Sequence, residues 1–149
     1  MESYLLAMLL GYLMTITIET AVLIALLSKR HSMRVRIFAG IWLSACTYPI
    51  VWLVLPELFS ERWLYLLVAE TFAPVAECAL FWFAFIRRLP ADEAPADDAA
   101  EANGVWWAPP RQRQRWSTIR DLAVIVLANL CSFAFGEVFN AFGGFDFLW

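Results

Sequence analysis

The chain has 149 residues, and its composition departs from that of a water-soluble domain. Hydrophobic residues make up 62% of it and the mean hydropathy is +0.63, whereas soluble domains hold about 45–50% apolar residues. The formal net charge of -3 predicts no partner, because the charges lie mainly in two connections between nearly uncharged stretches. We therefore expect a protein whose main partner is the lipid bilayer, with no nucleic-acid partner.

Four apolar stretches are long enough to cross a membrane, since a spanning helix needs about 20 mostly apolar residues. Segments of about ten residues with alternating polarity, which are typical of a membrane β-barrel, do not occur. The first stretch starts with Glu2, is too long for the apolar region of a signal peptide and precedes no A-x-A site, so we expect it to remain in the protein. The predicted fold is all-α, one four-helix transmembrane domain over residues 1–149, with helices at about Ser3–Leu27, Ile37–Leu55, Leu64–Ile86 and Asp121–Phe142.

Basic residues predict the orientation of these helices. Of the 11 basic residues, all except Arg62 lie either after the first predicted helix or between the third and the fourth. The positive-inside rule places both of these connections in the cytoplasm. The short connection from Pro56 to Trp63, which carries Glu57 and Glu61, then lies outside. We expect a multi-pass protein of a bacterial inner membrane with both termini outside.

The long second connection changes character along its length. Residues 90–104 are rich in Ala, Asp, Glu and Pro and are predicted to be disordered. Residues 105–118 mix tryptophan with arginine, which is typical of the lipid headgroup layer; a docking site for a partner is the alternative. The residues expected to contact the membrane surface are Trp106, Trp107, Arg111, Arg113, Arg115 and Trp116.

Three further expectations concern the ends of helices and the loops. Ser117 or Thr118 is expected to cap the fourth predicted helix, with Asp121 in its first turn. His31 lies in the first basic connection and is expected to be solvated. The closing segment Gly143–Trp149 is expected to lie along the outer interface.

Four glutamates lie inside the predicted spans: Glu19, Glu70, Glu77 and Glu137. A charged side chain at mid-helix costs about 2.5–3.5 kcal/mol on insertion scales, and the predicted spans hold no Lys, Arg or His to neutralise it. These carboxyl groups must therefore be protonated, hydrogen-bonded, exposed to a water-filled cavity or bound to a cation. Glu137 is near enough to its span end to reach the interface instead.

Helical spacing predicts where these groups meet. Glu70 and Glu77 are about two turns apart and share a face, and Pro74 leaves the carbonyl oxygen of Glu70 without its helical donor. Counting about 1.5 Å per residue places Glu19, Thr47, Glu77 and Asn129 within roughly 6 Å of the midplane. Glu19 and Glu77 are expected to approach each other or to share a water or cation, and at least one then holds a proton unless a cation intervenes. The predicted proton or cation site comprises Glu19, Glu70, Glu77, Asn129, Thr47, Thr15 and Glu137.

Simpler interpretations stand beside this one. Hydroxyl and amide side chains in a small bundle can serve only to hydrogen-bond neighbouring helices, at about 0.6 kcal/mol each. Free cysteines are commonly small buried apolar groups, so metal ligation by Cys46, Cys78 and Cys131 is disfavoured and no cofactor is assigned. Small residues at steps of four can pack within the monomer or form part of a homo-oligomer or larger assembly. They are Ala128, Ser132, Gly136 and Asn140.

These polar residues resemble the pattern of a family of small, functionally uncharacterised bacterial membrane proteins. That family has a glutamate in its first helix, a Thr-His-Pro-like element in its second, glutamates in its third and an asparagine in its fourth. The matching residues here are Glu19-Thr20, Thr47-Tyr48-Pro49, Glu70 with Glu77, and Asn129. Tyr48 stands where the pattern has histidine. The resemblance implies the four-helix architecture and the choice of polar residues, and no activity.

Three functions fit these observations. The intramembrane carboxyl groups favour a channel-like or transporter-like protein that handles protons or a cation. The small size and the small-residue ridge fit a non-catalytic subunit or assembly factor of a larger membrane complex. An intramembrane enzyme using Glu70 and Glu77 as acid and base is the third possibility, although no nucleophile, metal or phosphate motif accompanies them, so an enzyme is the less favoured class.

Overall fold

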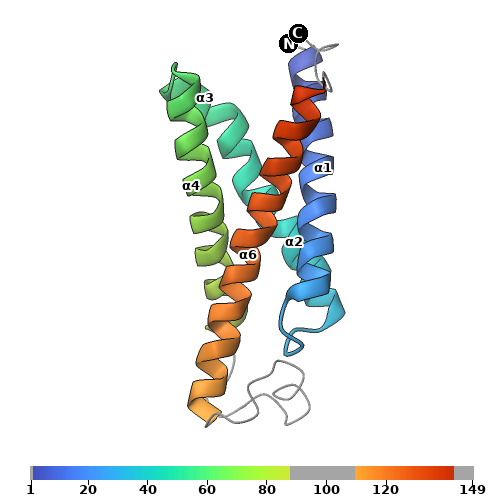
Figure 1. Ribbon diagram of the computed structural model, residues 1–149, viewed down its shortest axis with the longest axis vertical. Helices are drawn as coiled ribbons and strands as arrows, with labels where there is room; N and C mark the ends of the chain where they lie inside the picture. Colours follow the sequence, from blue (N-terminus) through green and yellow to red (C-terminus); the bar gives the residue numbers. More distant parts are fainter. Residues whose placement is uncertain (1, 88–109, 143–149) are drawn as a thin grey trace.

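The computed structural model describes residues 2–87 and 110–142 and shows an all-helical chain (Figure 1). Four of its helical runs are long and apolar enough to cross a membrane, and they cover Tyr4–Leu26, Met33–Leu58, Arg62–Ile86 and Arg115–Ala141. The prediction of four membrane-compatible helices is therefore confirmed. Their elements are α1 (Glu2–Leu26), α2 (Met33–Pro49) with the π-helical turn η1 (Ile50–Val54) and α3 (Leu55–Leu58), α4 (Arg62–Phe81) with the π-helical turn η2 (Trp82–Ile86), and α6 (Pro110–Ala141).

The four long helices form a ring in the order α1, α2, α4, α6, because each packs against its two neighbours in that order. Successive helices run in opposite directions, as expected for spans joined in sequence. The start of α1, the end of α6 and the α3–α4 connection therefore lie at one end of the bundle, which is the upper end in Figure 1. The α1–α2 connection and the start of α6 lie at the opposite end, which we name the basic end.

The second span is a single helical run that is irregular in its second half. Leu55 donates to the carbonyl of Ile50, five residues back, as in a π-helix. Pro56 has no N–H to donate to the carbonyl of Trp52, and the Tyr4 hydroxyl donates to that oxygen instead at 2.5 Å. In Figure 1 this run crosses obliquely from beside α1 to beside the start of α4. The upper parts of α1 and α4 are thereby held apart.

The close approach of α1 and α2 depends on Gly40. A Cβ atom at this position would lie 2.8 Å from the Cα of Thr20, which is well inside van der Waals contact. Only glycine therefore fits here without moving one helix. Within the small-residue ridge of α6, Gly136 faces α1, since a Cβ at this position would lie 3.8 Å from Met14.

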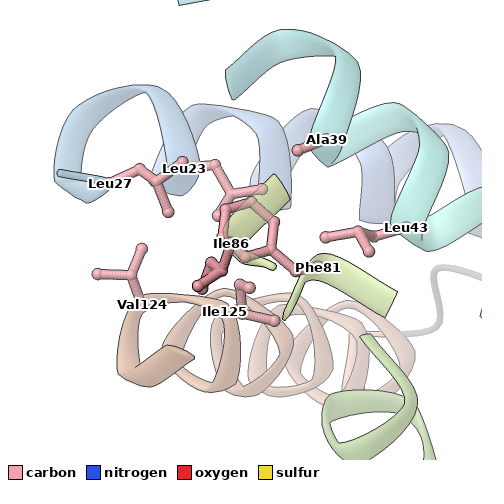
Figure 2. Close-up of a cluster of buried hydrophobic side chains, with 8 residues drawn as sticks. All are labelled: Leu23, Leu27, Ala39, Leu43, Phe81, Ile86, Val124 and Ile125. Atoms are coloured by element: carbon pink, nitrogen blue, oxygen red, sulfur yellow. The ribbon is translucent and has the colours of Figure 1, made fainter. Parts of the chain in front are cut away.

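The buried apolar core lies in the half of the bundle nearer the basic end. Figure 2 shows side chains from α1, α2, α4, η2 and α6 meeting around Phe81, which is completely buried. The outer surface is apolar as well, with large exposed side chains such as Leu9, Phe38, Val75 and Leu130. Such a surface suits contact with lipid, where apolar side chains need no burial inside the protein. The core cluster comprises Leu23, Leu27, Ala39, Leu43, Phe81, Ile86, Val124 and Ile125.

The structure corrects two predicted helix ends. The second span begins at Met33, with the Ser32 hydroxyl accepting from the N–H of Val35 at 3.4 Å, and runs to Leu58. The fourth helix begins at Pro110, eleven residues before the predicted start at Asp121. Ser117 and Thr118 are therefore inside α6, and the prediction that one of them caps this helix is wrong.

Most of the predictions about the connections concern residues that the structure does not describe. The stretch 90–104, Trp106, Trp107 and the segment Gly143–Trp149 lie outside the described residues, as do the side chains of Arg111 and Arg113. Arg115 and Trp116 are exposed on the first turns of α6.

Candidate functional site

A cavity of about 640 Å³ lies between the four helices, in the half of the bundle away from the basic end. Its rim includes Arg62 and Glu137, whose side chains are 71% and 46% exposed. Its inner end is lined by Glu19 and Glu77. The structure brings all seven predicted site residues to the wall of this cavity: Thr15, Glu19, Thr47, Glu70, Glu77, Asn129 and Glu137.

Glu19 is almost completely buried, at 3% exposure. Its two carboxyl oxygens lie 2.5 Å from the Ser44 hydroxyl of α2 and 2.8 Å from the Ser132 hydroxyl of α6. The carboxyl group therefore joins three helices through hydrogen bonds to neutral partners.

Glu77 is equally buried and has its own pair of partners. Its oxygens lie 2.9 Å from the Thr47 hydroxyl and 2.7 Å from the side-chain nitrogen of Asn129. The amide of Asn129 also donates to the carbonyl of Ile125 at 3.1 Å, so both of its protons are used. Glu77 thus ties α4 to α2 and α6, as Glu19 ties α1 to the same two helices.

The two carboxyl groups are connected through α6. The Ser132 hydroxyl that contacts Glu19 lies 2.9 Å from the backbone carbonyl of Asn129, whose side chain contacts Glu77. Within the described residues, no hydrogen bond joins the two carboxyl groups directly. They share the inner end of one cavity, and their partners Ser132 and Asn129 lie within one turn of each other on α6.

The hydroxyl groups of this site face more acceptors than they have protons. The Ser44 hydroxyl lies 2.5 Å from a Glu19 oxygen and 2.8 Å from the carbonyl of Gly40, yet its single proton serves one of them. Thr47 and Ser132 are each placed in the same way between a glutamate oxygen and a backbone carbonyl. A proton bound to Glu19 would supply the missing donor, because the acid could donate to Ser44 while Ser44 donates to Gly40. Rotation of a hydroxyl can therefore satisfy the carboxyl group with or without its proton.

The outer two glutamates are placed differently. Glu70 is half-buried on the cavity wall and makes no hydrogen bond or ion pair within residues 2–87 and 110–142. Glu137 is exposed and lies 3.9 Å from Arg62, which precedes the predicted third span and is the first residue of α4. In the described part of the chain, no group of three or more His, Cys, Asp or Glu side chains is placed to hold a metal ion. Cys46, Cys78 and Cys131 are free and only partly buried.

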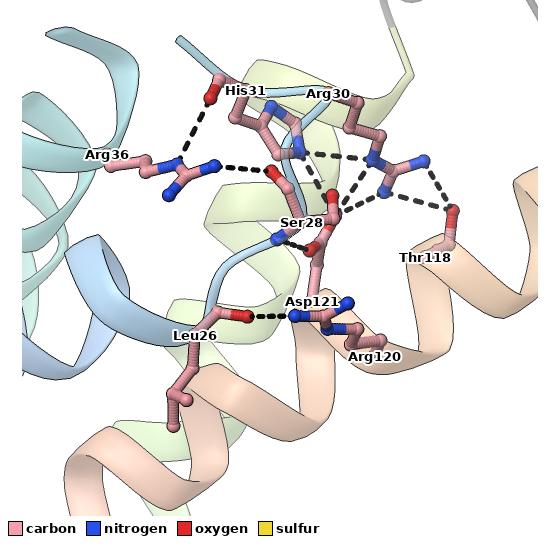
Figure 3. Close-up of polar contacts among 8 residues, drawn as sticks. All are labelled: Leu26, Ser28, Arg30, His31, Arg36, Thr118, Arg120 and Asp121. Carbon is pink, nitrogen blue, oxygen red and sulfur yellow. Dashed lines mark hydrogen bonds and ion pairs between the residues drawn. The ribbon is translucent and has the colours of Figure 1, made fainter. Parts of the chain in front are cut away.

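A second polar cluster, centred on Asp121 of α6, closes the basic end (Figure 3). One carboxyl oxygen of the fully buried Asp121 accepts from the backbone N–H of Ser28 at 2.8 Å. The other accepts from the Ser28 hydroxyl at 2.9 Å and pairs with Arg30 at 2.6 Å. His31 lies 3.0 Å from the same oxygen and is only 5% exposed, so the prediction of a solvated histidine is wrong. The Arg30 guanidinium also reaches the Thr118 hydroxyl at 3.3 Å. We name this set the Asp121 cluster.

Two further arginines fasten the end of α1 at this level. Arg36 donates to the carbonyls of Ile24 and Ser28 at 2.8 and 3.2 Å, and Arg120 donates to the carbonyl of Leu26 at 3.1 Å. The last carbonyls of a helix have no partner within the helix, and basic side chains there also oppose its negative dipole end. The α1–α2 connection is therefore anchored to α2 and α6 by charged groups.

The sequence contained a signal for the Asp121 cluster that the helix assignment concealed. An aspartate at the edge of a span needs a partner, because burying an unpaired charge is costly. In an antiparallel bundle the start of the fourth helix lies beside the end of the first, where Arg30 and His31 follow. The sequence-based expectation instead placed Asp121 in the first turn of the fourth helix, where the positive end of the helix dipole stabilises a carboxylate.

Comparison with protein-family models, with curated proteins and with solved structures finds no match to this chain. The resemblance to a family of small bacterial membrane proteins stays a prediction.

Proposed function

We propose that this chain is a small transporter-like protein of a bacterial inner membrane that takes up and releases protons at Glu19 and Glu77. The observation that carries the proposal is the pair of buried carboxyl groups at the inner end of a cavity, each held by neutral partners. A carboxyl group in a span is costly and commonly marks a proton or ion pathway. Purely structural hydrogen bonds could be made by Asn or Gln without that cost.

The distribution of charge supports an orientation with both chain ends outside. Lys29, Arg30, Arg34 and Arg36 lie at the basic end, together with Arg87, Arg115 and Arg120, which supports a cytoplasmic position for that end. Glu57 and Glu61 lie at the other end, beside the rim of the cavity. In this orientation the cavity opens to the outside, and protons reach Glu19 and Glu77 from there.

The proton count at the site suggests how a proton would be held. When a proton arrives at Glu19, the acid donates to Ser44 and Ser44 turns its own proton to the Gly40 carbonyl. When the proton leaves, Ser44 turns back to the carboxylate. Glu77 and Thr47 can do the same, with Asn129 donating in both states. The carboxyl group is hydrogen-bonded both with and without its proton, so the deprotonated state does not leave an unsolvated carboxylate in the membrane.

The closed basic end favours a carrier over an open channel. Between the carboxyl groups and the basic end lie the apolar core cluster and then the Asp121 cluster. Protons that enter from the cavity can continue only if these layers part, which is the alternating exposure of a carrier. Because four helices are few for such a movement, we include a homo-oligomer in the proposal.

Proton flux into liposomes tests this function. Purified protein is reconstituted with a pH-sensitive dye inside, and a potassium diffusion potential, negative inside, is imposed with valinomycin. We expect acidification faster than in empty liposomes, and a rate reduced by about tenfold or more in Glu19→Gln and Glu77→Gln. Glu61→Gln, an exposed glutamate off the cavity wall, is the matched control and should keep the wild-type rate.

Equal rates in the wild type and in a Glu19→Gln, Glu77→Gln double variant would contradict the proposal. So would a rate no higher than that of empty liposomes. Native mass spectrometry after gentle extraction would then ask whether the chain is instead a non-catalytic subunit, which should leave the membrane bound to other proteins.

A further inference from the structure

The size of the cavity exceeds what protons need. At about 640 Å³ it lies in the range of ligand sites, about 300–1,000 Å³, whereas a water molecule takes about 30 Å³. A proton path through a small bundle could consist of a few waters. The additional space is therefore large enough for a ligand of many atoms.

Aromatic rings form one wall of this space. Tyr48 and Trp52 stack with their ring centroids 5.7 Å apart, and Tyr4 lies against Trp52 at 5.8 Å. Tyr65 lines the same cavity from α4. The Tyr4 hydroxyl is bonded to the backbone of Trp52, which fixes the two rings relative to each other. Rings held in this way give the cavity a rigid aromatic wall, against which the apolar or aromatic body of a ligand can pack.

The charged side chains on the cavity wall are mainly acidic. They are four glutamates and one arginine, and that arginine lies 3.9 Å from Glu137. Glu19 and Glu77 have their hydrogen-bond partners on neighbouring helices. Glu70 has none within the described residues, and it lines the same space as the aromatic rings. Its carboxyl group is therefore placed to meet a positive group of a ligand.

We propose that the outer part of the cavity binds an amphipathic organic monocation, an amine or quaternary ammonium compound with an aromatic or aliphatic body. The cationic group lies near Glu70, and the apolar body lies against Trp52 and Tyr48. A bare metal ion would leave most of the cavity unfilled, and an anion would meet the glutamates. The inference adds a substrate class to the proposed function. Binding of the cation does not depend on that function; only its movement together with or against protons rests on it.

Calorimetric titration of the detergent-solubilised protein tests binding without any proton gradient. The probe is benzyltrimethylammonium, and the matched compounds are benzyl alcohol and benzoate, which carry the same ring without charge or with the opposite charge. We expect benzyltrimethylammonium to bind saturably and the two matched compounds not to. Glu70→Gln should raise the Kd of benzyltrimethylammonium by about tenfold or more, and Trp52→Leu should raise this Kd as well. Glu61→Gln should leave the Kd unchanged.

Two results would overturn the inference. Benzyl alcohol binding as tightly as benzyltrimethylammonium would indicate a merely apolar cavity that takes neutral molecules or lipid. An unchanged Kd in Glu70→Gln, in protein whose melting temperature and monodisperse elution match the wild type, would remove the carboxyl group from the site. The outcome is separate from that of the flux experiment: binding without proton flux keeps this inference and contradicts the proposed function, and flux without binding does the reverse.

Discussion

Neutralising Asp121 should loosen the basic end of the bundle. In Asp121→Asn the Arg30 guanidinium, whose side chain is 7% exposed, loses its charged partner. Removing one member of a buried ion pair costs about 3–5 kcal/mol, and we expect about 3 kcal/mol here because the new amide oxygen still accepts from Ser28. Asp121→Ala also leaves the Ser28 N–H without a partner, which adds about 1–3 kcal/mol. We therefore expect the free energy of unfolding to fall by about 5 kcal/mol in the alanine variant.

The measurement is unfolding in dodecyl maltoside micelles with an increasing mole fraction of dodecyl sulfate, followed by circular dichroism. Glu61→Ala, at an exposed position, is the control and should change the free energy by less than about 0.5 kcal/mol. Adding Arg30→Met to Asp121→Asn removes the unmatched charge, so the double variant should be more stable than the sum of its parts by about 2 kcal/mol. An alanine variant within about 1 kcal/mol of the wild type, or strictly additive effects, would refute the reasoning.

Three other predictions follow from the packing, the site and the orientation. Gly40→Ala should lower the free energy of unfolding by about 1–3 kcal/mol, because its methyl group would press on the backbone of Thr20. The dodecyl sulfate titration measures this free energy, and an unchanged value would contradict the close contact. Glu77→Lys should reduce the yield of folded, monodisperse protein in size-exclusion chromatography, because it buries an unmatched ammonium group. Elution of this variant like the wild type would contradict the buried position of residue 77 inside the bundle. With the native cysteines replaced, a cysteine at Ser60 should react with impermeant thiol reagents in intact cells and one at Asp97 should not, and the reverse pattern would invert the proposed orientation.

The sequence predicted the parts of the fold that depend on length and apolarity. Four runs of sufficient length were enough to locate the spans, because in lipid a backbone must satisfy its hydrogen bonds within a helix. The start of α6 was missed because hydropathy marks only the apolar part of a helix. Pro110 suits a first helical turn, and the Arg and Gln residues after it are good helix formers, so the helix extends beyond its apolar part.

The candidate site was predictable in its members and not in its pairings. The cost of buried carboxyl groups singled out Glu19 and Glu77, and helical spacing placed Thr47 and Asn129 at a similar depth. Both glutamates reach α2 and α6, so the order of helices does not decide their partners. That Glu77, rather than Glu19, takes Thr47 and Asn129 depends on how each helix is rotated about its axis and shifted along it relative to its neighbours, which spacing along one helix cannot specify. The cavity depends on the oblique course of the second span, which no single residue reveals.

The apolar core cluster has an electrical consequence. In a membrane, the cavity is open to one aqueous phase, so the potential difference falls mainly across the layer that excludes water, around Phe81 and Leu43. A charge binding near Glu70 would then cross little of the field. A charge moving from Glu77 past Phe81 would cross most of it, which is worth about 2.3 kcal/mol per elementary charge at 100 mV. Occupancy of the cavity should therefore respond weakly to membrane voltage, whereas the rate of passage through the core should respond strongly.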